Sequence, residues 1–194
     1  VVKLIQPSTT RCQAQCKHFG TCGGCKWQIL PYEEQLKYKQ QQIIDNLTRI
    51  GKIELPETNP ILGSQQIYEY RNKLEFTFSD RKWLSWDTIH AAGGLENVDN
   101  THGLGFHIPN CFDKVLDITE CHLMPDINNR IRNGIRERAR ALGLTFYNEH
   151  AHEGQLRTLI LRSNHKGGIM LIVVWADEPD MRLMEYIRDS FPEI

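Results

Sequence analysis

The sequence lacks the features that would place a protein in a membrane or outside the cell. No apolar run approaches the roughly 18 residues needed to cross a bilayer. The longest such run, residues 169–176, has the length of a strand. The first five residues are too few for the apolar core of a secretion signal. Six cysteines without such a signal indicate a reducing compartment, where clustered thiols bind metal or do chemistry. We therefore expect a cytoplasmic protein without a membrane span.

The chain also lacks a strong net charge of either sign. Its formal charge is −1 over 194 residues, of which 24% are charged. This excludes a globally basic nucleic-acid binder, so any RNA contact has to come from local cationic patches. The length suits one domain, or one domain plus a fragment. An apolar start without methionine and an end without a polar tail indicate a fragment of a longer protein.

The spacing of apolar residues predicts an α+β fold with a mainly antiparallel sheet flanked by helices. The expected strands cover residues 1–10, 67–79, 83–86, 104–108, 114–118, 156–163 and 169–175. The expected helices cover residues 31–50, 123–142 and 179–190. Polar stretches at 52–66 and 87–102 indicate a linker and a surface loop. The last strand is apolar on both faces, so we expect it at the centre of the sheet, covered by helices.

Three cysteines crowd one glycine-rich loop, residues 11–30, in the arrangement Cys16-x5-Cys22-x2-Cys25. Thiolates two residues apart reach one metal centre only if the backbone bends sharply. Gly23 and Gly24 permit that bend because they accept positive φ. Such crowding, with a distant fourth cysteine, is more typical of an iron–sulfur cluster than of zinc, whose sites more often use two close pairs.

A cluster needs a fourth ligand, and the spacing leaves a choice. Cys121 lies between a predicted strand and a predicted helix, Cys111 lies at a hairpin tip, and Cys12 is the weakest candidate. The spacing favours Cys121 only slightly over Cys111. A zinc site that uses His18 or His122 as a nitrogen ligand stays open.

The run His18-Phe-Gly-Thr-Cys-Gly-Gly-Cys25, with Trp27-Gln28 and the segment 32–37, closely resembles the central domain of RNA uracil-5-methyltransferases. The most similar branch modifies large-subunit ribosomal RNA and carries a 4Fe–4S cluster. Further similar segments extend the resemblance over nearly the whole chain, at residues 70–73, 105–107, 117–121 and 156–162.

The resemblance implies a ligand set and a place in a longer enzyme. The implied cluster ligands are Cys16, Cys22, Cys25 and Cys121. Residues 1–10 would be the last strand of an N-terminal RNA-binding β-barrel, and residues 11–194 the central cluster-bearing domain. The S-adenosylmethionine site and the cysteine nucleophile would lie in a doubly wound domain beyond residue 194. On this interpretation the chain itself holds no catalytic and no S-adenosylmethionine-binding residue.

RNA recognition by a monomeric enzyme is the expected role, with ribosomal RNA favoured over transfer RNA. On the helix 123–142, a row of arginines lies one position beyond the core stripe, and we expect it to face solvent and contact phosphates: Arg132, Arg136 and Arg140. The alternative is a solvated face paired with Glu137. Arg71 and Lys73 are further RNA candidates. Phe106 and His107 are candidates for stacking or hydrogen bonding with RNA, although a lone histidine in a strand is more often structural.

The cluster's expected role is architectural, because methyl transfer of this kind moves no net electrons. Two other functions stay open. One is a ferredoxin-like electron-transfer module, which the long arginine-bearing helix and the remote Cys121 disfavour. The other is a zinc-stabilised RNA-binding or interaction domain.

Overall fold

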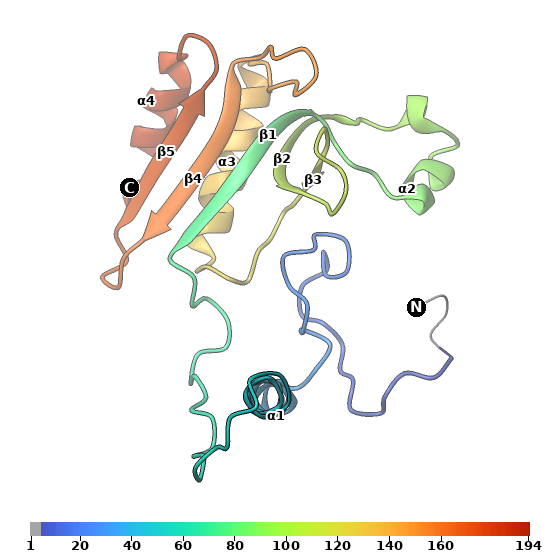
Figure 1. Cartoon of the computed structure of the whole chain (residues 1–194). Coiled ribbons are helices and arrows are strands. Elements are labelled where there is room, and N and C mark those ends of the chain that lie inside the picture. The colour runs from blue at the N-terminus through green and yellow to red at the C-terminus, as the bar shows by residue number, and fades with distance from the viewer. Residues whose placement is uncertain (1–4) are drawn as a thin grey trace. The chain divides into compact units, whose positions relative to one another are not determined.

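The computed structural model describes residues 5–194, and its packing divides the chain into two units. The first comprises residues up to 20 together with residues 24–67. The second comprises residues 21–23 together with residues 68–194. Figure 1 shows the cysteine loop and α1 in the first unit and the sheet with its helices in the second. Within residues 5–194, no helix combines the length and hydropathy of a bilayer crossing.

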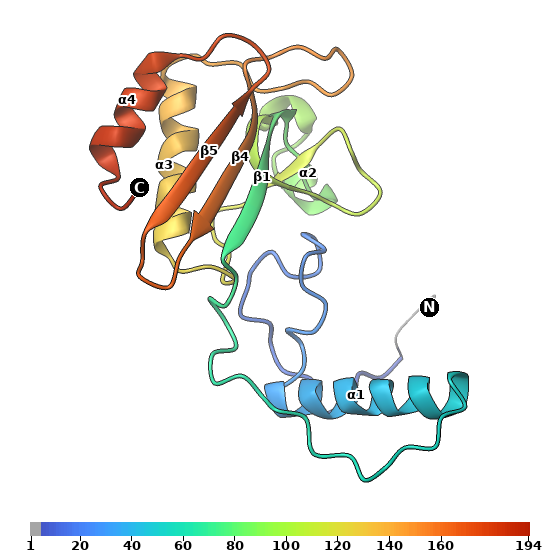
Figure 2. The same cartoon turned by 60° about the vertical axis from the view of Figure 1, so that its left-hand side comes forward.

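The first unit is built on α1, Tyr32–Asp45, which continues as a π-helical turn, Asn46–Ile50, and ends at Gly51. The predicted helix is thus confirmed. The segment 52–66 is more than a linker, because it runs back along the helix (Figure 2). The Gln40 amide receives the Ile61 N–H at 3.1 Å and donates to the Asn59 carbonyl at 3.2 Å. Gln40, which interrupts the apolar stripe, therefore ties this segment to the helix.

The second unit is a five-stranded antiparallel sheet in the order β3-β2-β1-β4-β5. Its strands are β1 Lys73–Arg81, β2 Thr101–His107, β3 Val115–Asp117, β4 Leu156–Ser163 and β5 Ile169–Trp175. Its α-helices are α2 Trp86–Ala91, α3 Ile127–Ala141 and α4 Met181–Ser190. Both views show α3 and α4 together on one face of the sheet (Figures 1 and 2). The α+β class and the antiparallel sheet are confirmed.

The core lies between the sheet and α3. Ile131, Ile135 and Ala139 are fully buried, as their helical spacing predicts. They pack in one cluster with the inward residues of the two central strands, among them Phe76 and Leu159. In α1, by contrast, no residue is buried.

Several predicted strands are wrong in place or kind. β5 is at the edge of the sheet rather than at its centre. One of its faces is also uncovered, since Met170, Ile172 and Val174 are exposed. Residues 83–86 form no strand, since Ser85 caps α2 by accepting the Thr88 N–H. The polar stretch 87–102 holds α2 and a short 3-10 turn, Leu95–Asn97.

The strand predicted at 67–79 begins only at Lys73. The strand predicted over residues 1–10 falls partly on residues 1–4, which lie outside the described residues. The rest of that stretch forms a bend at residues 5–6 and a turn at residues 9–10, and the sequence Pro7-Ser8-Thr9-Thr10 predicts such a turn after the strand.

Candidate functional site

The cysteine loop, most of which belongs to the first unit, is held by two glutamines. Gln28 accepts the Cys16 N–H on its side-chain oxygen at 3.0 Å. Gln35, in the first turn of α1, donates to the Trp27 and Leu30 carbonyls at 3.2 and 2.9 Å. Because these amide groups fix the backbone on either side of residues 17–26, the loop is attached to α1 without being part of a sheet.

Glycines provide the bends that the cysteine spacing requires. Gly20 has φ +88° and Gly23 has φ +74°, which only glycine adopts readily. The expectation for Gly23 is confirmed, whereas Gly24 is not among the residues with positive φ. Cys16, Cys22 and Cys25 are half-buried, and Cys12 is exposed. The three predicted ligands are thus partly withdrawn from solvent.

Cys121, in the second unit, lies in the connection between β3 and α3. Asn129 of α3 holds it by accepting the Cys121 N–H at 2.8 Å and donating to the Cys121 carbonyl at 3.3 Å. Asn129 is only 7% exposed, so its side chain is fixed by packing as well. This clamp sets the position of Cys121 relative to α3, at the junction that the sequence predicts.

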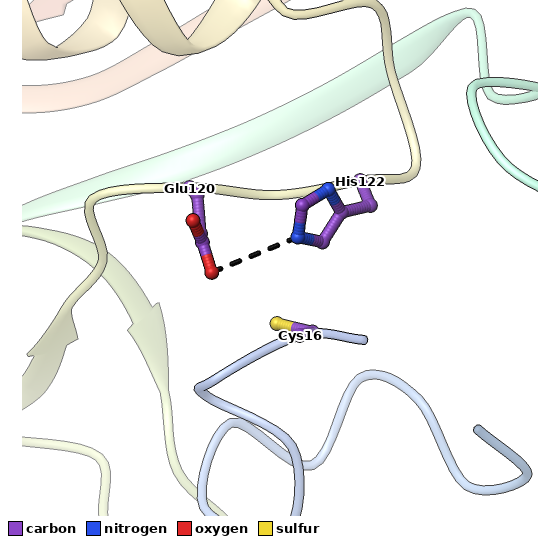
Figure 3. Close-up of side chains that lie close together, drawn as sticks. All are labelled: Cys16, Glu120 and His122. Atoms are coloured by element: carbon purple, nitrogen blue, oxygen red, sulfur yellow. Dashed lines mark ion pairs between the residues drawn. The ribbon is translucent and has the colours of Figure 1, made fainter. Parts of the chain in front are cut away.

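The residues on either side of Cys121 form an ion pair. His122 Nε2 lies 3.6 Å from Glu120 Oε1, and the contact is an ion pair when the imidazole is protonated (Figure 3). The backbone beside it is anchored to the lead-in of β1, because the Glu69 and Arg71 N–H groups donate to the His122 and Leu123 carbonyls. Residues 120–123 are therefore held by β1 on one side and by α3 on the other.

Arg132 lies close to Cys121 and is fully buried. Its guanidinium donates to the Asn129 and Asn133 side-chain oxygens at 3.1 and 3.3 Å and lies 5.1 Å from the Phe76 ring centroid. Within residues 5–194 no hydrogen-bond partner is present for its Nε. Burial lowers the pKa of Arg132 to about 10, and the charge of a Cys121 thiolate opposes that shift. The charges of Asp117 and Asp126 also oppose it, so the cation persists at neutral pH, with neutral amides as its side-chain hydrogen-bond acceptors.

The other two arginines of the row share two carboxylates. Both bind Glu137 Oε1, Arg136 at 3.0 Å and Arg140 at 3.2 Å, and both bind Asp117. Arg136 donates to Asp117 Oδ1 at 2.9 Å and to the Ile118 carbonyl at 3.0 Å. Arg140 donates to Asp117 Oδ2 at 3.2 Å and to the His102 carbonyl. Asp117 is the last residue of β3, so these ion pairs join the edge strand β3 to α3.

The predicted solvent-facing row is therefore wrong, whereas the pairing with Glu137 that the alternative predicts is present at Arg136 and Arg140. Arg132 is 0% and Arg136 6% exposed, and most of the Arg140 side chain is covered. The buried surface of α3 extends beyond its apolar residues, so the positions next to Ile131 and Ile135 are buried as well. The sequence signal for this arrangement is Asp117 at a strand end, which supplies the compensating charge.

The remaining predicted RNA contacts differ in exposure. Arg71 and Lys73 are exposed, and Lys73 forms a surface ion pair with Glu75 at 3.5 Å. His107 is half-buried, with its Nδ1 hydrogen-bonded to the Lys114 carbonyl at 3.0 Å. Phe106 packs against Phe76 in the core with ring centroids 5.0 Å apart, so it does not offer an open stacking surface.

Cys111 has a different environment from Cys121. Its thiol donates to Asp113 Oδ1 at 3.5 Å, in the connection between β2 and β3. Burial opposes ionisation of Asp113, but the hydrogen bonds from Cys111 and His150 outweigh it, and the pKa of that carboxyl is lowered. Cys111 therefore makes a local contact at the hairpin tip, as its position in the sequence predicts.

Comparisons with known proteins connect these features to a family name. No protein-family model matches the chain. A protein of Bacteroides thetaiotaomicron named as an uncharacterized RNA methyltransferase is 49% identical over the full chain. A protein of Porphyromonas gingivalis with the same name is 44% identical, again over the full chain. The chain is a relative of proteins named RNA methyltransferases.

The chain spans 43% of the length of each of these two relatives. Among solved structures, it resembles the crystal structure of the Pyrococcus abyssi tRNA (uracil-54, C5)-methyltransferase in complex with S-adenosyl-L-homocysteine. The TM-score is 0.61 at 22% identity, over 95% of this chain and 37% of that one. This likeness concerns the fold: a region of that enzyme has the architecture described above.

Proposed function

We propose that the chain is the RNA-recognising, cluster-bearing part of a longer S-adenosylmethionine-dependent RNA (uracil-C5) methyltransferase. The observation that carries the proposal is identity of 49% over the whole chain to part of a protein named RNA methyltransferase. The shared fold with part of a tRNA (uracil-54, C5)-methyltransferase supports the uracil specificity. An enzyme of this kind acts where RNA is made and used, so the cytoplasm is the expected compartment.

The reaction divides the work between this chain and the rest of the protein. Carbon 5 of uracil gains the methyl group, the sulfur–methyl bond of S-adenosylmethionine breaks, and the proton on carbon 5 leaves to a base. We assign the nucleophile and the S-adenosylmethionine site to the remaining part of the longer protein. A base in folded RNA has to be flipped out before it can react. The work of this chain is to bind the RNA around that base.

Cys16, Cys22, Cys25 and Cys121 are the residues that would hold the 4Fe–4S cluster. The half-burial of these thiols, the positive φ of Gly23 and the clamp on Cys121 support this assignment. A cluster with four thiolates is an anionic group, and the buried Arg132 beside Cys121 offers it a positive charge whose side-chain hydrogen-bond acceptors are neutral amides. When bound, the cluster would fix the loop 11–30, and methyl transfer would not require its redox chemistry.

Exposed cations are the side chains that can reach RNA phosphates. We therefore assign phosphate contacts to Arg71 and Lys73 and give the arginines of α3 a structural role. A contact from His107 remains a prediction. Ribosomal RNA is the proposed substrate on the sequence resemblance, and transfer RNA is the competing one.

Release of tritium from RNA labelled at carbon 5 of uracil tests the reaction. The longer parent protein, given S-adenosylmethionine, is expected to release tritium from one uridine of a ribosomal RNA transcript. A transfer RNA transcript is the parallel arm. Methyl incorporation without tritium release would contradict attack at carbon 5, and no incorporation into either RNA would contradict the proposed function.

Iron, sulfide and zinc analysis after anaerobic purification tests the cluster. About four iron and four sulfide per parent protein are expected. Cys121→Ser should lose most of the iron, and the matched control Cys111→Ser should keep it. A result of one zinc and no sulfide per protein would show a zinc site instead of the cluster. Equal loss of iron in both variants would contradict the ligand assignment.

The RNA surface is tested by the salt dependence of binding. Arg71→Gln and Lys73→Gln should each weaken RNA binding and reduce the slope of log K against log salt by about 0.7 to 0.9. Arg188→Gln, an exposed arginine of α4, is the matched control. Equal slopes in all three variants would contradict the assignment of phosphate contacts to Arg71 and Lys73.

A further inference from the structure

The residues of the edge strand β5 lack the charges and prolines that usually protect an edge strand. The seven residues Ile169–Trp175 include no charge, no proline and no glycine. On the face of the sheet away from the core, the side chains of β5 also remain exposed, with Met170 at 58% and Ile172 at 42%. Natural edge strands carry charges, prolines or bulges because an open apolar edge pairs with other chains. An edge of this composition indicates that another segment covers it in the complete protein.

One hydrogen bond shows which backbone groups of β5 point to its outer edge. The Ile169 N–H donates to the Glu193 carbonyl at 3.0 Å, so this N–H points away from β4. In an antiparallel pair, the residues that bond the neighbouring strand alternate with those that face outward. Leu171 and Val173 therefore present their N–H and carbonyl groups on the same outer edge as Ile169. Residues 193–194 already lie at the first position of that edge.

The path of the chain through α4 fits a parallel strand. After β5 the chain enters α4, which packs beside α3 on the helical face of the sheet. It then returns to the beginning of β5, where Glu193 is bonded. Strand, helix and return to the start of the strand form the first two parts of a β-α-β unit, whose third part is a strand parallel to the first.

We propose that the outer edge of β5 is a docking site for a sixth strand, supplied by the polypeptide that follows residue 194 in the longer protein and parallel to β5. This inference rests on the proposed function in one respect, that the chain is part of a longer protein. The relatives of which it spans 43% have the length for such a strand. The pairing would join this unit to the following domain through backbone hydrogen bonds.

Residue-resolved hydrogen exchange of the parent protein tests the pairing. The amides of Leu171 and Val173 should exchange as slowly as those of Met170 and Ile172, which are bonded to β4. In a chain ending at residue 194, the first two amides should exchange at least about tenfold faster while the other two stay slow. Slow exchange at Met170 and Ile172 also shows that the shortened chain is folded.

A proline variant gives an independent readout. Proline is tolerated on an edge strand whose N–H faces solvent, but it disrupts a strand that is paired on that side. In the parent protein, Val173→Pro should therefore lower the melting temperature clearly more than Val173→Ala, which keeps the N–H. In the chain ending at residue 194 the two variants should differ little.

The outcomes separate this inference from the proposed function. Fast exchange at Leu171 and Val173 in a parent protein that methylates RNA would overturn the docking strand and leave the function intact. Protection that appears only at high protein concentration, with doubled mass, would assign the edge to a second copy and overturn it as well. Protection in a monomer that does not act on RNA would support the strand and reject the function.

Discussion

α1 and α3 have nearly the same length and the same kind of apolar spacing, yet they differ completely in burial. Of the 15 residues of α3, seven are buried, whereas none of the 14 residues of α1 is. Ile135 is fully buried in α3, and Ile43 of α1 is 57% exposed. The segment 52–66 is too narrow to cover the apolar stripe of α1, while a whole sheet face covers α3.

The polar residues of α1 and α3 differ in burial in the same way. In α3, buried arginines are compensated by Asp117 and by backbone carbonyls. In α1, Gln40 makes two hydrogen bonds to an extended segment, and Arg49 forms an exposed pair with Asp45. Helical spacing thus predicts that a helix forms, but what lies opposite the helix decides how strongly each position contributes to stability.

The largest contrast is expected from truncating one isoleucine in each helix. Ile135→Ala should lower the free energy of unfolding by about 2 to 5 kcal/mol, because it leaves a cavity in the core. Ile43→Ala should cost about 0.5 kcal/mol or less. Urea unfolding followed by circular dichroism measures both. Equal losses would show that the α1 stripe is covered in solution.

Breaking one ion pair in each helix sharpens the comparison. Arg136→Ala should cost about 2 to 3 kcal/mol, because it leaves a partly buried Asp117 with one arginine instead of two. Arg49→Ala, which removes an exposed pair at 3.2 Å, should cost about 0.5 kcal/mol. The same urea titration applies. A small loss for Arg136→Ala would contradict a structural role for the arginine row.

Removal of the Gln40 amide tests the first unit alone. Gln40→Ala should cost about 1 kcal/mol, because the Ile61 N–H loses its acceptor. Faster hydrogen exchange at Ile61 is the specific readout. Gln41→Ala is the matched control, since the Gln41 side chain bonds Asp45 within the helix. Unchanged exchange at Ile61 would separate the 52–66 segment from α1.

The smallest effect is expected from acid. The Lys82 ammonium, which donates to Asp99, holds the pKa of that carboxyl well below its usual value of 3.8. A lowered pKa stabilises the fold above pH 3.8, and the contribution is lost as pH falls below that value. Asp99→Asn should therefore flatten the pH dependence of stability below about pH 4, and should do so only slightly because Asp99 is largely exposed. An unchanged acid profile would contradict the pairing.

Much of the fold could be predicted from local pattern. The three longer helices and the hairpin of β4 and β5 follow from apolar spacing and from the turn at residues 164–168. The position of β5 could not, because an apolar strand has the same sequence whether helices or solvent cover its second face. The strand predicted at 83–86 is wrong for a local reason. The two tryptophans of this stretch favour a strand, but Ser85 caps the helix α2, which begins at Trp86.

The candidate site was predicted unevenly. The bend at Gly23 and the position of Cys121 between strand and helix follow from residue type and order, and the structure confirms both. The four-cysteine ligand set stays a prediction. Asn129 and Asp117 were not predicted, because each acts on a residue 8 or 19 positions away, across the connection from β3 to α3.

The sequence by itself determined where the three longer helices and the β4–β5 hairpin form and which loop crowds its cysteines, because these depend on neighbours within a few residues. The tertiary structure alone decided that the arginines of α3 are buried, that Cys121 is clamped by Asn129, and that β5 has an open edge. Burial and pairing depend on which segments meet in space, and a charge becomes structural only when the fold brings an acceptor to it.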